Sequence, residues 1–589
     1  MSQPPIAELK DVTFSYSQGD ETALSHVSLS LNEGDFVGIL GPSGAGKSTL
    51  AACLSGAIPH HFRGELYGAT IIEGMDTCEV SLTDISQVVG SVLQDIDAQM
   101  VASVVEDELL FGLENFGVPH DEIPHRLTSA LETVGIAHLR DREIATLSGG
   151  QKQKVAIAAI LALSPHMLVL DEPTAALDPA SSQLVFDTLK HIQETQKITV
   201  VVIEQKVALL SQYADRIIVM DQGHIVYDAS APAVFSHAKE LRALGVDSPR
   251  TARISNSLKE KGLIDASEPP ALSVHATHDL IARTLAGKVR DLGEKTHELK
   301  QSSPHAPRAR SREDMPCAVR LTDVSFTYPV TGDGVHNLSM QVLPGELVGV
   351  VGQNGAGKTT LTKLLNGLLK PTQGTVEVAG MDTQATPVSR IAQKVSTLFQ
   401  NPDRQLCKNT VLEEVAFGLT LHGTPQDEAL ERAHATIERF HLPEQESPFS
   451  LSRGQRQMVA LASVVVMHPN VVLLDEPTSG LDYRECMTVM ETVKEMAERG
   501  CAVIMVCHDM EVVSDFAERL VVMAHGEILR RGTKDELFQD RELMHAASVE
   551  APQVIRLSQA LAQDVSDSFQ GISQVSGIVD TVEEMLRRG

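Results

Sequence analysis

The sequence predicts an α/β fold that is built twice, with a parallel sheet and crossover helices in each half of the chain. Two observations support this prediction. Long segments of the first half recur in the second, as in "MLVLDEPTAALD" (167–178) and "VVLLDEPTSGLD" (471–482), and matching positions between residues 41 and 205 of the first half and their counterparts lie 303 to 311 residues apart. Short apolar runs such as "FVGIL", "TVVVI" and "AVIMV" alternate with longer segments of helical periodicity, which is typical of buried parallel strands joined by helices.

The repeat also sets the expected domain organisation, because 589 residues are too many for one hydrophobic core. The segment at 240–258 resembles that at 542–561, so each half is expected to carry a small C-terminal appendage. The polar stretch between the halves contains two prolines and lacks apolar periodicity, which is typical of a linker. The predicted parts are a first domain at 1–235, its appendage at 236–293, a linker at 294–315, a second domain at 316–540 and its appendage at 541–589.

Composition narrows the possible functions. The formal net charge of −29 argues against a protein whose main task is binding nucleic acid, because phosphate backbones require basic surfaces. The seven cysteines form no CxxC pair and no zinc-ligand spacing, so a reducing compartment is the simplest interpretation. We expect no signal peptide, because the N-terminus has no basic region followed by an apolar run. We also expect no membrane-spanning helix, because the longest mostly apolar stretch, 155–170, is short and interrupted. Any membrane part would therefore come from another subunit.

A glycine-rich loop follows the first apolar run in each half, as "GPSGAGKST" (41–49) and "GQNGAGKTT" (352–360). Glycines let backbone N–H groups face a phosphate, and the helix that follows adds the positive end of its dipole. The lysines would reach the outer phosphates and the next hydroxyl would ligate magnesium. The predicted phosphate-binding residues are Gly41, Ser43, Gly44, Gly46, Lys47, Ser48 and Thr49, and Gly352, Asn354, Gly355, Gly357, Lys358, Thr359 and Thr360.

Two carboxylates end a second apolar run in each half, in "LVLDE" and "VLLDE". Asp171 and Asp475 would hold the magnesium shell, together with Ser48 and Thr359. Glu172 and Glu476 are placed to polarise an attacking water. A phosphate-bearing ligand and Mg²⁺ are therefore expected, and the family resemblance described next implies that this ligand is ATP.

The order of these motifs resembles the ATP-binding cassette (ABC) ATPases, with two P-loop NTPase domains, each having a parallel-sheet core and a helical subdomain, in one chain. We refer to 1–235 and 316–540 as the first and second cassettes. The resemblance implies that Tyr16 and Tyr328 stack on adenine, and that Gln94 and Gln400 sense magnesium, as ligands of its shell, and the transmembrane partner. It further implies that Asp178 and Asp482 link the two sites, and that His508 contacts the terminal phosphate as a catalytic switch.

The family also assigns a role to "LSGGQKQ" (147–153) and "LSRGQRQ" (451–457), whose residues contact ATP bound to the opposite cassette. The resemblance thus implies intramolecular pairing of the two ABC domains, in which ATP favours the closed pair. The signature residues are Ser148, Gly149, Gly150 and Gln151, and Ser452, Arg453, Gly454 and Gln455.

Two departures from the family pattern predict unequal sites. Gln205 stands where the second half has His508, and Arg453 replaces the first signature glycine. In a head-to-tail pair both departures fall in the site that contains Lys47 and Glu172. Because glutamine cannot carry the positive charge of histidine, we expect this site to turn over slowly and the second-cassette site to be more active. The alternative is that both changes are tolerated, since Glu172 is retained.

The segments after the two glutamines, "QDIDAQMVASVVEDELLFGLEN" and "QNPDRQLCKNTVLEEVAFGLT", resemble ATPases of energy-coupling factor (ECF) importers. The first is more divergent, with Ile96 where proline is usual. This resemblance implies a motor on the cytoplasmic face of the membrane, with a transmembrane scaffold subunit and a small substrate-capture membrane subunit as partners. The implied substrates are vitamins, vitamin precursors or metal ions.

Two alternatives remain open at this point. A soluble tandem cassette protein that acts on ribosomes would also have two cassettes and no membrane span, but it would be expected to carry basic surfaces for RNA. The other alternative is a two-cassette ATPase of a sugar importer. The transported compound does not follow from this sequence, because specificity would reside in another polypeptide.

Overall fold

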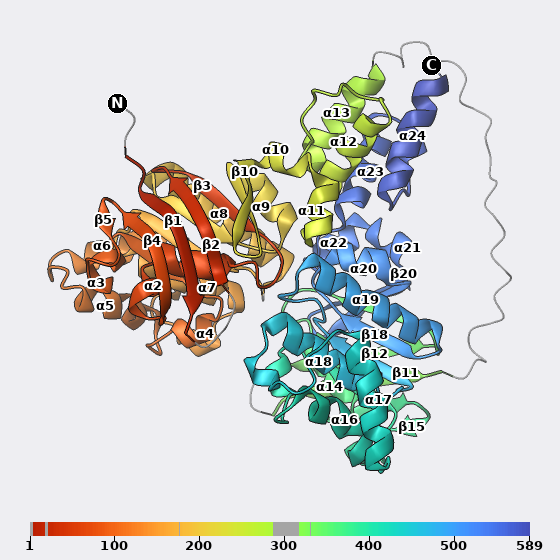
Figure 1. Ribbon diagram of the computed structural model, residues 1–589. Helices are drawn as coiled ribbons and strands as arrows, with labels where there is room; N and C mark the ends of the chain where they lie inside the picture. Colours follow the sequence, from red (N-terminus) through yellow and green to blue (C-terminus); the bar gives the residue numbers. More distant parts are fainter. Residues whose placement is uncertain (1–3, 18–21, 176, 287–316, 330–331, 589) are drawn as a thin grey trace. The chain divides into compact units, whose positions relative to one another are not determined.

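The computed structural model describes residues 4–17, 22–175, 177–286, 317–329 and 332–588. The chain forms two compact units, one made of residues 1–256 and 269–273 and the other of residues 257–268 and 274–589 (Figure 1). The predicted linker, 294–315, lies outside the described residues. Within the described ranges, every helix is too short or too polar to cross a lipid bilayer.

A six-stranded sheet forms the centre of the first unit, in the order β10-β9-β3-β8-β7-β6. All its strand pairs are parallel except β9 with β10, which confirms the predicted α/β class. The central strands β3 and β8 are buried along their whole length, as expected for a parallel sheet covered on both faces. The strands are β3 Phe36–Leu40, β6 Val89–Val92, β7 Met167–Asp171, β8 Thr199–Ile203, β9 Arg216–Asp221 and β10 His224–Ser230.

The two faces of this sheet contribute to separate cores, because neighbouring strand residues point to opposite sides. Phe36 and Leu40 pack into a core with the helices α5 to α8. Val37 and Ile39 pack on the other side with α1 and a four-stranded antiparallel sheet, β2-β1-β4-β5, which the sequence analysis did not predict. The strands of this sheet are β1 Ala7–Tyr16, β2 Thr22–Leu31, β4 Gly64–Ile72 and β5 Met75–Asp76.

The helices of the first half connect these strands. They are α1 Lys47–Leu54, α2 Ala57–His60, α3 Leu82–Ser86, α4 Ile96–Gln99, α5 Val105–Asn115, α6 Ile123–Thr133, α7 Gly149–Leu161, α8 Pro179–Gln196, α9 Val207–Tyr213, α10 Ala231–Phe235, α11 Ala238–Leu244 and α12 Arg250–Glu260, with short 3-10 turns at Ala137–Leu139 and Ile144–Thr146. Helix α12 crosses the boundary between the units at Asn256.

The second unit repeats both sheets, in the orders β16-β17-β18-β13-β19-β20 and β12-β11-β14-β15. The strands are β11 Val319–Thr327, β12 Gly334–Val342, β13 Leu347–Val351, β14 Gln373–Val378, β15 Met381–Asp382, β16 Val395–Leu398, β17 Val471–Asp475, β18 Ala502–Val506, β19 Arg519–Ala524 and β20 Glu527–Thr533. The helices are α14 Lys358–Leu365, α15 Val388–Ile391, α16 Val411–Leu421, α17 Gln426–Arg439, α18 Arg453–Val465, α19 Tyr483–Glu498, α20 Met510–Phe516, α21 Lys534–Phe538 and α22 Arg541–Ala546, with short 3-10 turns at Pro402–Arg404 and Pro448–Ser450.

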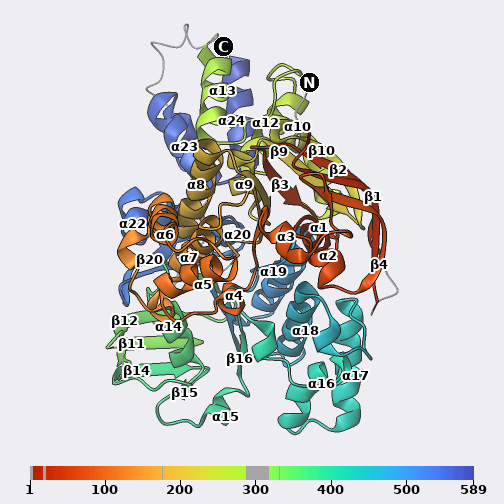
Figure 2. The ribbon, with the colours of Figure 1, turned by 90° about the vertical axis from the view of Figure 1, so that its left-hand side faces the viewer.

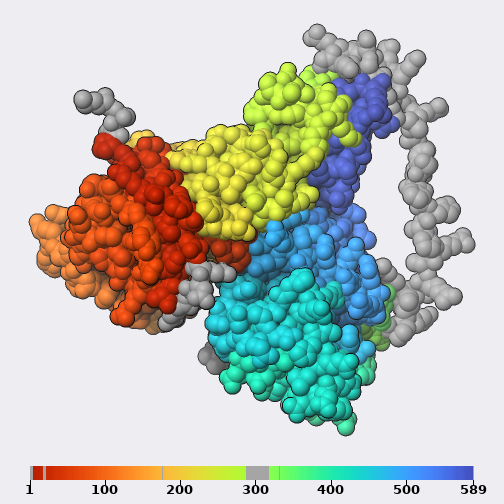
Figure 3. Space-filling view, viewed as in Figure 1, coloured from red at the N-terminus to blue at the C-terminus, as the bar shows by residue number. Residues whose placement is uncertain are grey.

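Part of the first predicted appendage belongs to the second unit, where it packs against the second predicted appendage. Helix α13 (Val274–Ala286) contacts both α23 (Gln553–Asp564) and α24 (Val575–Arg588), and these helices lie side by side (Figures 1 and 2). The same segments touch in the space-filling view (Figure 3). Lys261 donates to Asp580 at 2.8 Å and to Glu583 at 2.6 Å. The two duplicated appendages therefore contribute to one helical module.

Phe569, in the short 3-10 turn before α24, is fully buried in this module. We expect Phe569→Ala to reduce the free energy of unfolding of the module by about 3–5 kcal/mol, because it leaves a cavity. Hydrogen exchange should become faster across 553–588 and stay unchanged in β13. Leu421→Ala, at a side chain that is 70% exposed in α16, is the control and should change neither segment. Unchanged exchange at 553–588 in Phe569→Ala would contradict this description of the module.

Candidate nucleotide-binding and hydrolysis sites

The glycine loop of the first cassette joins β3 to α1, and two of its glycines are tightly enclosed. A Cβ on Gly41 (φ 154°) would collide with the carbonyl oxygen of Met220, and one on Gly46 (φ 94°) would lie 2.5 Å from the carbonyl oxygen of Ala23. Gly44 (φ 76°) faces open space. Other residues rarely adopt such dihedral angles, so the loop requires glycine on both steric and conformational grounds.

The second cassette has the same loop geometry between β13 and α14. Gly352 (φ 152°) lies against the carbonyl oxygen of Met523, and a Cβ on Gly357 (φ 95°) would lie 2.6 Å from the Val335 side chain. Gly355 (φ 82°), like Gly44, has open space around it. The two loops therefore present their backbones in the same way.

A buried lysine lies at the first position of the helix after each loop. The Lys47 ammonium donates to the carbonyl oxygens of Gly41 at 2.9 Å and Pro42 at 2.7 Å. Lys358 donates to Gly352 at 2.6 Å and Gln353 at 2.9 Å. Both side chains are less than a tenth exposed, so each loop holds a positive charge beside the backbone that would receive phosphate.

In each cassette the predicted metal-binding aspartate ends a strand, and the predicted metal-binding hydroxyl lies in the first turn of the helix after the glycine loop. Burial raises the pKa of Asp171, whereas a hydrogen bond from Ser48 and the charge of Lys47 act in the opposite direction. Burial likewise raises the pKa of Asp475, which Lys358 and Lys363 oppose. A hydroxyl and a carboxylate next to a phosphate loop are ligands that fit Mg²⁺, which commonly uses few protein ligands plus phosphate oxygens.

Both predicted catalytic glutamates have a strained backbone. Glu172 and Glu476 have positive φ angles of 48° and 49°, which are uncommon for residues other than glycine. Their N–H groups donate to the carbonyl oxygens of Ile203 and Val506, each at 2.9 Å, at the ends of the neighbouring strands. Strain that is fixed by the surrounding structure is frequent at functional sites, and it occurs identically in the two cassettes.

The side chains around these two carboxylates differ. Gln94 donates its amide to Glu172 Oε2 at 2.6 Å and Gln205 donates to Glu172 Oε1 at 2.7 Å. In the second cassette the backbone N–H of His508 donates to Glu476 Oε2 at 3.1 Å, and its Nε2 lies 3.3 Å from Oε1. Neutral amides thus hold both oxygens of Glu172, whereas Glu476 faces an imidazole that can gain a proton.

The segment around Gln205 contains two further polar residues that the sequence analysis did not consider. Glu204, which is 2% exposed, accepts a hydrogen bond from Thr174 Oγ1 at 2.6 Å. The Lys206 ammonium donates to the carbonyl oxygens of Thr174 at 2.7 Å and Leu177 at 3.0 Å, and to Ser182 Oγ at 2.9 Å. These bonds connect the segment after β8 to the loop after Glu172.

The corresponding residues of the second cassette, Cys507 and Asp509, make different contacts. Asp509 caps its own helix by accepting from the N–H groups of Glu511 and Val512. Burial raises the pKa of Cys507 well above its usual value, and its sulfur lies 3.9 Å from the Thr478 hydroxyl. Aligning the complete segments "IEQK" and "VCHD", beyond the histidine position alone, would have revealed the difference.

The two signature segments begin their helices in the same way despite the arginine. Ser148 forms a reciprocal capping box with Gln151 at the start of α7, and Ser452 does so with Gln455 at the start of α18. The Arg453 side chain packs over Gly480, where an added Cβ would lie 3.1 Å from the guanidinium carbon. The arginine is therefore accommodated without loss of the helix cap.

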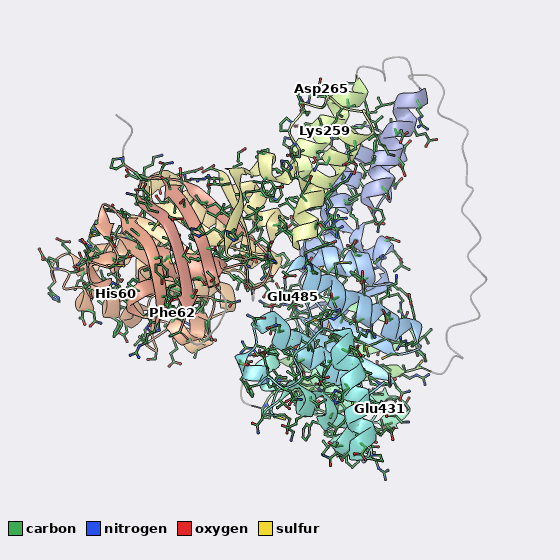
Figure 4. The ribbon with its side chains drawn as sticks, in the orientation of Figure 1. His60, Phe62, Lys259, Asp265, Glu431 and Glu485 are labelled. Carbon is green, nitrogen blue, oxygen red and sulfur yellow. The ribbon has the colours of Figure 1, made fainter. Side chains whose placement is uncertain are left out.

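The backbone of the second signature glycine has a different neighbour in each cassette. The Ser181 side chain lies beside Gly150, and the Glu485 carboxylate, labelled in Figure 4, lies beside Gly454. Asp178 and Asp482, the predicted linking aspartates, cap α8 and α19 by accepting from the N–H groups of Ser181 and Glu485, each at 2.8 Å. This capping role is independent of any nucleotide.

Each predicted adenine-stacking tyrosine is tied to the helix after its glycine loop. The hydroxyls of Tyr16 and Thr49 are 3.1 Å apart, and those of Tyr328 and Thr360 are 3.4 Å apart. The rings pack edge-on against Phe14 and Phe326. The first cassette thus gathers Tyr16, Lys47, Gln94, Asp171, Glu172 and Gln205 on one unit, and the second gathers Tyr328, Lys358, Asp475, Glu476 and His508 on the other.

Comparison with known proteins shows the family of this chain. A family model described as ABC transporter matches residues 24–175 and 335–479. A Caldanaerobacter subterraneus subsp. tengcongensis protein that is named as an ABC transporter ATP-binding protein is 35% identical over 94% of this chain and 96% of its own. A Methanosarcina mazei protein of the same name is 35% identical over 95% of each chain. The solved structure of cbiO1 from Clostridium perfringens, described as part of the ABC transporter complex cbiONQ, is 30% identical over 41% of this chain and 95% of its own, with a TM-score of 0.37.

The two classes of loop glycine lead to a prediction for the second cassette. Gly352→Ala should lower both thermal stability and ATP affinity, because the new Cβ meets the carbonyl oxygen of Met523 and the dihedral angle is strained. Gly355→Ala is the control, since its Cβ enters open space and leaves only the dihedral strain, which costs about 1–3 kcal/mol. Thermal melts with and without ATP would measure both effects. Equal melting temperatures for the two variants would show that the close contact at Gly352 is absent.

Proposed function

The chain belongs to the ABC transporter family of ATP-binding proteins and is expected to hydrolyse ATP, and we propose that it is the motor of an ECF-type importer. In this proposal the chain lies on the cytoplasmic face of the membrane, and its substrate passes through separate membrane subunits. The substrate would be a vitamin, a vitamin precursor or a metal ion. The observation that carries the proposal is the sequence after Gln400, "QNPDRQLCKNTVLEEVAFGLT", combined with two cassettes in one chain.

The segments that begin just before Gln94 and Gln400 offer apolar side chains that could bind a membrane partner. Leu93, Val101 and Phe111 are 54%, 64% and 49% exposed in the first cassette. Phe399 and Leu421 are 37% and 70% exposed in the second. Exposed apolar side chains near one segment often indicate a protein–protein contact. We therefore propose that these segments receive short helices of the scaffold subunit.

We further propose that the two cassettes pair within the chain and that their sites work unequally. The different surroundings of Glu172 and Glu476 support this. Two amides hold Glu172 without offering a group that can exchange a proton, whereas the His508 imidazole offers one. In the proposed pairing, with magnesium at each site, Arg453 would face the first-cassette nucleotide and the unaltered signature of Ser148 to Gln151 would face the second.

Separate substitutions of the two glutamates test the inequality. Glu476→Gln should lower the rate of ATP hydrolysis by about 100-fold or more, since a lost general base typically costs that much. Glu172→Gln should lower it by a much smaller factor. Steady-state phosphate release by the full chain measures both, with ATP binding as the control for folding. Equal losses in the two variants would overturn the proposed inequality and leave the importer proposal intact.

Co-purification tests the importer proposal. The chain should purify from its native membranes together with a scaffold membrane protein and a small substrate-capture protein, and the reconstituted complex should take up its substrate only with ATP. Leu421→Asp should reduce recovery of the scaffold, whereas Leu184→Asp, at a 54% exposed position on α8, should not. Recovery of ribosomes would favour a ribosome-acting ATPase, and recovery of a large permease would favour a sugar importer.

A further inference from the structure

The first cassette contains five residues that the second lacks, between two pairs of matching glycines. Gly56 and Gly68 are twelve positions apart, whereas Gly367 and Gly374 are seven apart. The match is structural, because added Cβ atoms on Gly56 and Gly367 would each lie 2.5 Å from an isoleucine side chain. Gly68 and Gly374 both have positive φ and both face two successive backbone carbonyls of the neighbouring strand.

The additional residues extend strand β4 along strand β1. The β1–β4 ladder continues through Leu66 and Glu65 until Gly64 pairs with Tyr16. In the second cassette the β11–β14 ladder ends where Gln373 pairs with Ser325, three residues before Tyr328. The insertion therefore places an additional segment of the chain directly beside Tyr16, the predicted adenine-stacking residue of the first cassette. The second cassette lacks this insertion.

Phe62 is the residue that this segment places against Tyr16. The two ring centroids are 5.9 Å apart with the planes at 88°, and Phe62 remains 40% exposed. Arg63 fixes the position of the segment, because its carbonyl oxygen accepts hydrogen bonds from Ser17 N at 3.1 Å and Ser17 Oγ at 3.0 Å. Figure 4 shows Phe62 and its neighbour His60 on the first unit. Within the described residues, the one ring contact of Tyr328 is with Phe326.

We propose that Phe62 is a second base-contacting residue of the first cassette, so that this cassette binds purine nucleotides more tightly than the second. A partly exposed aromatic ring beside Tyr16 offers a further surface to the π-face or edge of a purine, which removes apolar area from water. Phenylalanine has no hydrogen-bonding group, so it adds affinity for purines without selecting adenine over guanine. The proposal depends on the role proposed for Tyr16.

A binding experiment on the full chain separates base contact from phosphate contact. Lys358→Ala confines tight nucleotide binding to the first site. Calorimetry in the presence of Mg²⁺ then measures the binding of either a non-hydrolysable ATP analogue or inorganic tripolyphosphate. Phe62→Ala should weaken the binding of the analogue by about tenfold and leave the binding of tripolyphosphate unchanged. Phe62→Trp should retain the affinity. Tyr67→Ala, which removes a 62% exposed aromatic side chain from the strand that follows Phe62, is the matched control and should change the binding of neither ligand.

The other outcomes are equally informative. If Phe62→Ala weakens the binding of both ligands equally, Phe62 only supports the fold of the loop and the proposal is overturned. Loss of analogue affinity in Tyr16→Ala but not in Phe62→Ala would overturn it while preserving the role of Tyr16. Unchanged affinity in both variants would overturn the two roles together.

Discussion

A phosphate can be bound by backbone N–H groups only where no side chain intervenes, and this constraint determines the arrangement of each cassette. Gly41 and Gly46 must be glycine for a second reason, because the backbone of neighbouring strands encloses them. Because β3, β8 and β7 are parallel neighbours, their carboxyl ends meet at one edge of the sheet. The loop, the carboxylates after β7 and the segment after β8 are thereby brought together, and a chemical site results from strand order.

The backbone of this arrangement is the same in both halves, whereas the side chains that surround the predicted catalytic glutamate differ. Glu172 and Glu476 share the same strained dihedral angle and the same hydrogen bond to the next strand. The differences begin at the side chains, with Gln205 in place of His508. Changes of this kind would alter proton transfer and charge without changing the shared backbone.

Much of the fold and of the candidate sites could be predicted from the sequence because the information is local. The runs "FVGIL" and "TVVVI" identified buried parallel strands, and the glycine loop specified its own dihedral angles. The contact of Gln94 with Glu172, 78 residues apart, was not predicted, because the family resemblance assigned Gln94 only to magnesium and the transmembrane partner. The bonds of Lys206 to the Thr174–Leu177 loop, the antiparallel sheet and the joint packing of the appendages were not predicted, because each depends on residues that meet only in the folded chain. The extended β4 ladder could have been found by counting residues between the matching glycines.

Duplication within one chain explains how such differences can persist. In a symmetric dimer of identical cassettes, a substitution enters both sites at once, so a change that slows hydrolysis would disable the whole motor. In a fused pair it enters one site only. The two amides on Glu172 would slow turnover in the first cassette, and the aromatic ring of Phe62 beside Tyr16 would increase nucleotide affinity in the same cassette. Both changes would act in one direction, toward a site that retains its nucleotide, while the cassette with His508 would keep the groups proposed for repeated hydrolysis.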